Sequence, residues 1–522
     1  RRRTFAIISH PDAGKTTLTE KLLLYGGAIH MAGAVKSRKA QRAATSDWME
    51  LERKRGISVT SSVLQFEYLD IRWNLLDTPG HQDFSEDTYR TLTAADCAIM
   101  LIDAAKGVEA QTRKLFHVCR LRGIPIVTFV NKLDRPGRDP FNLMAEVEEV
   151  LGLHTVPLTW PIGSGDRFQG VYDRQAACVL RFSKADVAAS RRALVETSGL
   201  GDPQLDSLLG EEAAASLRDE VELLEGAGEP FSEAGFVAGE LTPVFFGSAL
   251  TNFGIEPFLH RFRTLCPAPG PRPVAGGRHI RPQDNAFSAF VFKVQANMDP
   301  SHRDRIAFAR ICSGRFEGGM RVHHHRLGKV IRLNRAEQFF AQERESVLEA
   351  FPGDIVGLYD PGLFRVGDTL SEDAELHFDA VPRFSPEHFA RLRLLDPMKR
   401  KQLQKGIEQL AEEGTVQLFI EPGREKDPIC GVVGRLQFDV LAYRLEHEYG
   451  ARVALDTLGY SLARWIEGAQ KVAELKARRV AMGVADLDGH PVALLRDDWE
   501  ADRLARDNPN WTLHETAPMG PR

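Results

Sequence analysis

The 522-residue sequence lacks the features of membrane, disulfide-rich and low-complexity proteins. No apolar run approaches the roughly 18 residues that a membrane-spanning helix requires, and no secretory signal follows the basic N-terminus. The six cysteines are scattered without a C-x-x-C pair, which argues against a disulfide or zinc framework and is typical of free thiols in a reducing, cytoplasmic setting. With 43% hydrophobic and 27% charged residues, the sequence predicts a globular protein of roughly three domains.

A large excess of one charge is also missing. The net charge of −5 argues against wholesale coating of nucleic acid. The charge is uneven, however: residues 1–60 carry 12 Lys/Arg against 5 Asp/Glu, whereas residues 202–233 carry 10 Asp/Glu against one Arg. A polyanionic partner near the N-terminal part is one interpretation, and solvated faces of opposite sign are the other.

The chain is organised around the stretch from Ser9 to Thr16, which reads S-H-P-D-A-G-K-T. It follows the apolar residues 5–8 and precedes leucines at helical spacing, so it predicts a strand, a tight loop and the start of a helix. Such a loop binds anions with its backbone amides and the helix N-terminus. Gly14 permits close approach to a ligand, and Lys15 can reach the outer phosphates. The pattern is G-x-x-x-x-G-K-[ST] with serine in place of the first glycine.

Strands and helices alternate after this loop, and a polar motif follows the end of several strands. The apolar runs 97–103 and 124–130 are typical of strands buried on both faces of a parallel sheet, and 110–121 has helical character. We therefore predict a doubly wound α/β domain with its ligand at the carboxyl ends of the strands. The motifs at these ends are D-T-P-G-H at 77–81, N-K-L-D at 131–134 and S-A-L at 248–250.

Together these motifs predict a GTP site. The Asp134 carboxylate can accept hydrogen bonds from the ring N–H and the exocyclic amine of guanine, which adenine does not offer in that arrangement. Asn131 can bond the other base edge, and Lys132 can lie over the ring. The predicted GTP-binding residues are Ser9, His10, Pro11, Asp12, Ala13, Gly14, Lys15, Thr16, Thr17, Asp77, Thr78, Pro79, Gly80, His81, Asn131, Lys132, Leu133, Asp134, Ser248, Ala249 and Leu250.

A magnesium ion is expected beside the phosphates. The Thr16 hydroxyl can bind Mg²⁺ directly, and the Asp77 carboxylate can hold it through water. Ser58 lies in a long connection after the first helix, where its hydroxyl can complete the Mg²⁺ shell. The predicted Mg²⁺ ligands are therefore Thr16, Ser58 and Asp77.

Three domains are predicted along the chain. Residues 1–270 form the P-loop GTP-binding domain, with an insertion at about 155–240 that carries an acidic amphipathic helix. The proline-rich residues 266–282 are typical of a linker. Short alternating strands predict a β-barrel over 283–378. The order strand, helix, strand, strand, helix, strand then predicts a ferredoxin-like α+β domain over 383–522, with the part after about 470 unplaced.

The motifs G-K-T-T, R-G-I-S, D-T-P-G-H-x-D-F and N-K-L-D resemble those of the translational GTPases. Within that group, S-H-P-D-A-G-K-T-T-L-T-E-K-L-L and V-K-S-R-K-A-Q-R-A-A-T-S-D-W-M-E-L-E are similar to the bacterial peptide chain release factor 3 family, and the likeness extends to at least residue 465. Ser58 departs from the threonine usual in the wider superfamily, but it keeps the hydroxyl. We also expect the chain to be too short for the two further domains of elongation factor G, to which the family is related.

The resemblance implies a GTPase that the ribosome activates and that promotes dissociation of class I release factors after peptide release. It implies that the catalytic residue His81 orients the attacking water, while Mg²⁺ and Lys15 hold the phosphates. GTP binding would order the loop from Tyr25 to Ser58. Expected partners are the ribosome, both rRNA and ribosomal proteins, and class I release factors, with no membrane and with the chain as a monomer. Candidate rRNA contacts are Arg391, Arg393, Lys399, Arg400 and Lys401, and the acidic residues 202–233 could meet a ribosomal stalk protein.

Three other interpretations remain open at this point. The chain can be a translocation or recycling factor like elongation factor G. It can be a GTP-dependent ribosome-binding module in which hydrolysis only resets the cycle. A signalling GTPase unrelated to ribosomes is disfavoured by the two domains after the linker.

Overall fold

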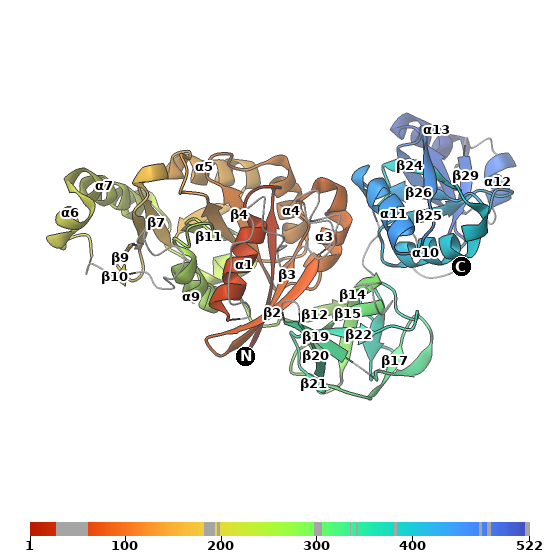
Figure 1. Cartoon of the computed structure of the whole chain (residues 1–522), viewed down its shortest axis with the longest axis horizontal. Coiled ribbons are helices and arrows are strands. Elements are labelled where there is room, and N and C mark those ends of the chain that lie inside the picture. The colour runs from red at the N-terminus through yellow and green to blue at the C-terminus, as the bar shows by residue number, and fades with distance from the viewer. Residues whose placement is uncertain are drawn as a thin grey trace. The chain divides into compact units, whose positions relative to one another are not determined.

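The computed structural model describes residues 1–27, 61–181, 194–195, 199–296, 305–334, 336–340, 343–379, 384–468, 472–477 and 482–516. The chain divides into two units, whose elements are labelled in Figure 1. The first unit comprises Arg1–His81, Thr91–Gly270 and Gln338–Glu345, and the second comprises Gln82–Arg90, Pro271–Glu337 and Ser346–Arg522. Within the described ranges, no helix is both long and apolar enough to span a bilayer.

A seven-stranded sheet forms the centre of the first unit, in the order β2-β3-β1-β4-β5-β11-β6. Every neighbouring pair is parallel except β2 with β3, which confirms the predicted α/β fold. Strands β4 and β5 are buried at every position, because helices cover both faces of such a sheet. The elements are β1 (Arg2–Ser9), α1 (Lys15–Tyr25), β2 (Ser62–Tyr68), β3 (Ile71–Asp77), β4 (Cys97–Asp103), α4 (Ala110–Leu121), β5 (Ile126–Asn131), α5 (Pro140–Leu151), β6 (His154–Pro157), β11 (Leu241–Phe246) and α9 (Ile255–Leu265). Helix α3 (Ser85–Leu92) lies, up to Arg90, in the segment assigned to the second unit.

The predicted insertion forms a separate small sheet with the order β10-β9-β8-β7. Its acidic helix α7 (Glu211–Ala227) buries one stripe, made by Ala214, Leu217, Val221 and Leu224. That spacing is the helical repeat seen in the sequence, except that Ala214 and not Ala213 lies deepest. The other elements are β7 (Thr159–Ile162), η2 (Gly165–Arg167), β8 (Gly170–Asp173), β9 (Cys178–Arg181), β10 (Leu194–Val195), α6 (Gln204–Leu209) and α8 (Glu233–Ala238).

The second unit begins, after its short segment at 82–90, with a region of β-structure. An eight-stranded sheet has the order β18-β17-β23-β14-β15-β22-β19-β20, in agreement with the predicted β-barrel class. The proline-rich stretch expected to be a linker contains a hairpin of β12 with β13. Of its prolines only Pro273 lies in these strands, where a two-stranded pair needs few ladder hydrogen bonds. The strands are β12 (Arg272–Val274), β13 (Arg278–Ile280), β14 (Ser288–Ala296), β15 (Arg305–Ser313), β16 (Phe316–Glu317), β17 (Arg321–His324), β18 (Lys329–Arg332), β19 (Ala336–Phe340), β20 (Glu343–Val347), β21 (Glu349–Ala350), β22 (Ile355–Tyr359) and β23 (Thr369–Ser371).

The C-terminal part of the second unit contains the predicted ferredoxin-like motif. The four strands of the motif pair antiparallel in the order β27-β24-β26-β25, and α10 and α11 share a core with them. The same sheet continues beyond β25 with β29, β30, β28 and β31. Of these strands, β29, β30 and β31 come from the stretch after about 470 that the sequence left unplaced. The elements are β24 (His388–Leu394), η4 (Pro397–Lys399), α10 (Arg400–Glu412), β25 (Gln417–Ile420), β26 (Ile429–Val432), α11 (Leu436–His447), β27 (Val453–Leu458), β28 (Leu462–Glu467), α12 (Val472–Ala477), β29 (Met482–Asp486), β30 (Pro491–Leu495), α13 (Asp498–Asp507) and β31 (Thr512–His514).

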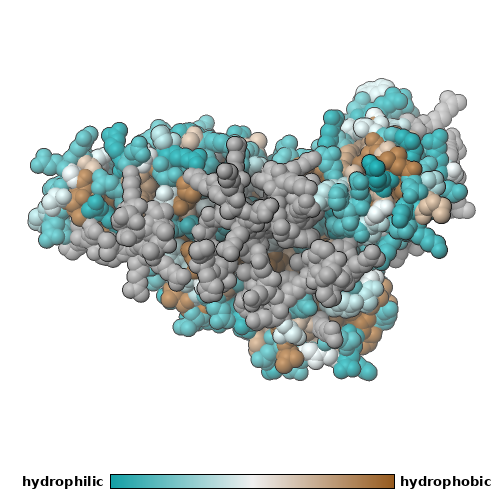
Figure 2. Space-filling model, in the orientation of Figure 1, coloured by the Kyte–Doolittle hydropathy of each residue, from teal (hydrophilic) through white to brown (hydrophobic). Residues whose placement is uncertain are grey.

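Hydrophilic residues cover most of the coloured surface on the face shown in Figure 2, and hydrophobic residues form small patches among them. Among the residues that the structure describes, the most exposed large apolar side chain is that of Met398 in η4, with 86% of its surface accessible. Next to it in sequence stand the basic residues Lys399, Arg400 and Lys401.

Candidate nucleotide-binding site

The loop between β1 and α1 has the geometry of a phosphate-binding loop. Gly14 precedes α1 in the left-handed region with φ 98°, where L-residues with a side chain are strained. A Cβ at Gly14 would also lie 2.4 Å from Nδ2 of Asn131, so only glycine fits. Ser9 ends β1 with its hydroxyl buried and without a partner among the described residues. The loop therefore presents backbone amides and a buried hydroxyl in front of a helix N-terminus.

The motif after β3 is attached to the same loop. Asp77 Oδ1 accepts a hydrogen bond from Lys15 Nζ at 2.5 Å, and both side chains are buried, with 2% and 7% of their surface exposed. Thr78 Oγ1 donates to the carbonyl oxygen of Ile7 at 2.7 Å. Buried charges are stable only when they are paired, so Lys15 and Asp77 hold each other in register where β1 and β3 end.

Asn131 joins the phosphate loop to the loop after β11. Its Nδ2 donates to the carbonyl oxygen of Ala13, and its Oδ1 accepts from the backbone N–H of Ala249, both at 2.8 Å. The sequence had assigned this amide to an edge of the base. In the structure both ends of the amide bind the backbone, so Asn131 aligns two loops that are far apart in sequence.

Lys132 crosses the same region from the other side. This residue has a positive φ of 72°, and its Nζ donates to Asp103 Oδ2 at 2.8 Å and to the carbonyl oxygen of Asp12. Burial raises the pKa of Asp103, but the hydrogen bond from Lys132 and those from the amides of Ala105 and Lys106 outweigh it, so the pKa lies below its ordinary value. The ammonium group of Lys132 is thus held by Asp103 and by the backbone of the phosphate loop.

Asp134 is oriented by the serine predicted to share its site. Ser248 Oγ donates to Asp134 Oδ1 at 2.6 Å, and Ser248 is fully buried. Arg135 Nε lies 3.9 Å from the other carboxylate oxygen. Leu133 N–H donates to the carbonyl oxygen of Gly247, so the two base-recognition segments are also linked through their backbones. The hydrogen bond from Ser248 therefore fixes the orientation of the Asp134 carboxylate.

His81 lies between β3 and η1 (Gln82–Phe84) and is partly exposed. The residues after it bind the C-terminal domain. Asp83 Oδ2 accepts from the backbone N–H of Leu436 at 2.7 Å, at the first residue of α11, and a Cβ on Gly434 would lie 2.2 Å from the Asp83 carboxylate carbon. A carboxylate at a helix N-terminus is favoured by the helix dipole.

Arg90 strengthens the same attachment. It is buried, pairs with Glu86, and donates from Nη1 to the carbonyl oxygens of Gly414 at 3.3 Å and Glu413 at 3.5 Å. The ring of Tyr89 meets that of Phe384 edge-on, with centroids 5.0 Å apart. The segment that follows His81 is therefore held by a helix N-terminus, by backbone carbonyls and by an aromatic contact.

The residues named from the sequence do not all enter this arrangement. Ser58 and most of the loop that begins at Tyr25 lie outside the described residues, so that Mg²⁺ ligand and the ordering of the loop stay predictions. Two residues that the sequence did not single out also take part: Asp103, which binds Lys132, and Asp83, which binds Leu436. Asp103 could have been found from the sequence, because it ends a buried apolar run like the strands that carry the motifs. The contact of Asp83 with Leu436 could not, because no local pattern connects the two residues.

Among the predicted rRNA contacts, Arg400 donates to the carbonyl oxygen of Lys426, and two other arginines pair with carboxylates. Arg391 pairs with Glu421 at 2.6 Å and is largely buried, and Arg393 pairs with Asp456 at 3.3 Å. The charges of these two side chains are thus compensated locally.

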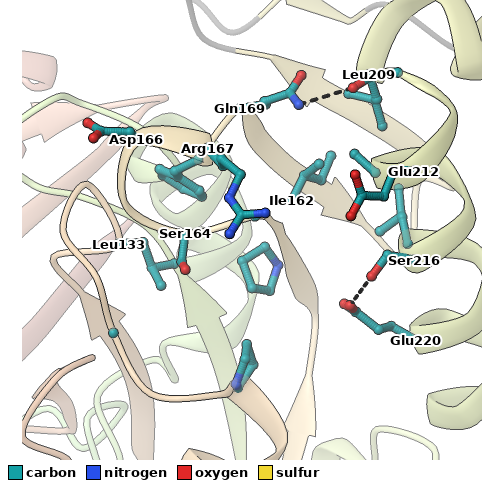
Figure 3. A pocket seen from close by; sticks show the side chains of 18 of the residues that line it. Leu133, Ile162, Ser164, Asp166, Arg167, Gln169, Leu209, Glu212, Ser216 and Glu220 are labelled. Carbon is teal, nitrogen blue, oxygen red and sulfur yellow. Dashed lines mark hydrogen bonds between the residues drawn. The ribbon is translucent and has the colours of Figure 1, made fainter.

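A groove lies beside Leu133 of the N-K-L-D motif, as Figure 3 shows. This groove, of about 1020 Å³, runs between Leu133, the β7–β8 connection and α7. Arg167 points into it, and Ser216 Oγ on its far wall donates to Glu220 at 2.7 Å. The groove contains none of the phosphate-binding residues, so we do not assign the nucleotide to it.

The residues present fit GTP and Mg²⁺. Gly14 leaves room for close approach, the Ser9 hydroxyl is buried without a partner in the described part of the chain, and the Lys15 ammonium is positioned for phosphate. Thr16 and Asp77 offer the hard oxygen donors that Mg²⁺ prefers.

Comparison with known families places each part of the chain. The family model "Elongation factor Tu GTP binding domain" matches residues 1–268, and "Elongation factor G domain 2" matches 286–373. The model "Class II release factor RF3, C-terminal domain" matches 378–505.

Relatives match along nearly the whole chain. The peptide chain release factor 3 of Symbiobacterium thermophilum is 59% identical over 519 residues, which covers 99% of this chain and 98% of the relative. That of Acaryochloris marina is 55% identical over 99% of this chain and 96% of its own length. A crystal structure of a Thermus thermophilus protein has a TM-score of 0.69 at 22% identity, covering 90% of this chain and 71% of that one; this likeness shows the fold alone.

Proposed function

Because the chain belongs to the peptide chain release factor 3 family, we propose that it dissociates class I release factors from the ribosome after peptide release. Membership already makes it a release-factor GTPase that binds GTP and GDP and interacts with the ribosome. The observation that carries the finer function is the 59% identity over 99% of the chain, because it extends through the C-terminal domain as well as the GTPase domain.

The proposed chemistry is attack of water on the γ-phosphorus of GTP, with GDP as the leaving group. Phosphoryl transfer depends mainly on positioning and on neutralising charge. In this role His81 orients the attacking water, Lys15 binds the outer phosphates, and the amides that precede and begin α1 bind the remaining oxygens. Mg²⁺, held by Thr16, Asp77 and Ser58, supplies charge neutralisation on the phosphates.

Guanine selectivity is assigned to the strand-end loops. Asp134 accepts the two guanine hydrogen bonds, and Ser248 fixes its carboxylate. Of the predicted segment 248–250, the backbone N–H of Leu250 is assigned to the guanine oxygen, because the N–H of Ser248 donates to Phe253 and that of Ala249 to Asn131. Lys132 covers the ring. Asn131 acts as a positioning residue that aligns the phosphate loop with the loop after β11.

Contact with rRNA is assigned to Lys399, Arg400 and Lys401 rather than to the two arginines of β24. Support comes from the carboxylate partners of Arg391 and Arg393, which compensate those charges. Phosphate contacts of this kind weaken steeply with salt. The chain is proposed to work as a monomer, and the acidic helix α7 is a candidate surface for a ribosomal stalk protein.

The decisive experiment measures GTP turnover with and without ribosomes, together with release-factor recycling and translocation on purified ribosomes. Ribosome-stimulated turnover with recycling supports the proposal. Translocation without recycling would assign the chain to elongation-factor-like work instead. Release-factor dissociation that proceeds for a single round, and no further, with a non-hydrolysable GTP analogue would make it a binding module whose hydrolysis only resets the cycle.

A further inference from the structure

The side chain of His10 is tied to an element that the nucleotide-binding motifs do not include. Nε2 of His10 lies 3.1 Å from Oε1 of Glu109, and both side chains are mostly buried, with 30% and 24% of their surface exposed. At this separation the carboxylate contacts the edge of the imidazole and restricts the orientation of the ring. Nδ1 of His10 is buried and has no partner among the described residues.

The side chain of Glu109 contacts His10 and does not cap its own helix. It is the residue before α4 and has an extended backbone, yet its side chain makes no capping hydrogen bond. Its carboxylate lies instead near two basic side chains, His10 and Lys106, the latter at 3.9 Å. Replacing the side chain should therefore leave the start of α4 intact.

The phosphate loop in turn supports the residue before His81. A Cβ added to Gly80 would touch Pro11 N and Cα at 3.6 Å and the carbonyl carbon of His10 at 3.8 Å. These are ordinary van der Waals distances, so a side chain at Gly80 would pack against the backbone of His10 and Pro11, and the two segments lie next to each other. Upstream, Thr78 is bound to Ile7, so the D-T-P-G segment lies along the start of the phosphate loop.

From these contacts we infer that Glu109 and His10 form a brace that sets the position of Gly80, and through it of His81, for hydrolysis. Both are positioning residues. The inference rests on the proposed function, because it concerns the water-orienting role of His81. Lys15, Asp134 and the α1 N-terminus bind the nucleotide independently of this brace, so its loss affects the chemical step more than binding. Small displacements of catalytic groups are costly in phosphoryl transfer, where positioning supplies most of the catalysis.

The test compares Glu109→Ala, Glu109→Gln and His10→Ala in the full chain. Binding is measured with fluorescent GTP and GDP, and hydrolysis is measured in single turnover on ribosomes. We expect Glu109→Ala to reduce the hydrolysis rate about tenfold and to change nucleotide Kd less than about threefold. His10→Ala should lower the hydrolysis rate to a similar extent. Glu109→Gln keeps the length of the side chain and an oxygen beside Nε2 of His10, and should recover most of the rate.

Glu67→Ala is the matched control, since Glu67 pairs with Arg72 at 3.2 Å on the exposed β2–β3 hairpin. Equal hydrolysis rates for wild type, Glu109→Ala and Glu67→Ala would overturn the inference, as would a loss in Glu109→Ala that is confined to Kd or that Glu109→Gln fails to recover. If wild type itself shows no stimulation by ribosomes, the proposed function fails rather than the brace.

Discussion

Removing the amide of Asn131 should weaken the binding of GTP and GDP equally. In Asn131→Ala, the carbonyl oxygen of Ala13 and the N–H of Ala249 each lose a 2.8 Å partner in a buried setting. Each lost bond is worth about 0.5–1.5 kcal/mol, and a group left buried and unpaired costs somewhat more. The sum is about 2–3 kcal/mol of the free energy that keeps the two loops aligned. Because the nucleotide binds the aligned loops, Kd should rise by up to roughly 30- to 150-fold.

The assay is equilibrium titration of the full chain with fluorescent GDP and GTP. Asn131→Asp is the informative companion, because it keeps the acceptor for the Ala249 N–H and replaces the donor to Ala13 by a second oxygen, which repels the carbonyl. We expect it to bind no better than Asn131→Ala. The reasoning is refuted if Asn131→Ala binds both nucleotides within about twofold of wild type, or if it loses affinity for GTP alone, since Asn131 touches nothing that distinguishes a third phosphate.

Four further outcomes are expected. His81→Ala should retain GTP affinity and lose ribosome-stimulated hydrolysis, measured as phosphate release; unchanged turnover removes His81 from the mechanism. Ser248→Ala removes the 2.6 Å bond to Asp134 and should weaken GTP binding by about 1 kcal/mol, or roughly fivefold, with a smaller preference over ATP in competition titrations. Gly434→Ala places a methyl 2.2 Å from the Asp83 carboxylate carbon and should lower the free energy of unfolding of the second unit by about 1–3 kcal/mol, measured by thermal unfolding. Gly423→Ala is the control: it has open space around it and should cost only the strain of one residue in the left-handed region. The pKa of Asp103 is lowered in the folded protein, so its contribution to stability is fully present above the pKa of the unfolded state and is lost as the pH falls through the pKa of the folded state. The difference in free energy of unfolding between wild type and Asp103→Asn should therefore be constant at neutral pH and shrink below about pH 4.

The α/β sheet could be predicted because its strands are continuous apolar runs that end in polar motifs. Runs such as Cys97–Asp103 are buried on both faces of the sheet, and a continuously apolar sequence is what such a strand requires. The ferredoxin-like motif was predictable for a similar reason, since its helices bury regular stripes such as Leu403, Ile407 and Leu410.

The remaining features depend on contacts between residues that are distant in sequence. Asn131 reaches Ala13 across 118 residues, and Asp83 reaches Leu436 across 353, so no local pattern announces either bond. The role expected for Asn131 followed from its motif alone, and the motif does not reveal that both ends of the amide bind the backbone. The last strands were not placed because they are short and pair with strands from elsewhere in the domain.

The pairing of β25 with β29 has a consequence for how this domain is made. In a bare βαββαβ sheet β25 would form an open edge, and an open edge can recruit a strand from another molecule. Here β29 covers that edge, and Trp465, Val484, Val492 and Leu494 complete a core with Phe419. A nascent chain that has emerged only as far as β27 therefore carries an unfinished edge and half of a core. Until the last strands are synthesised, this domain is the part of the chain most exposed to aggregation.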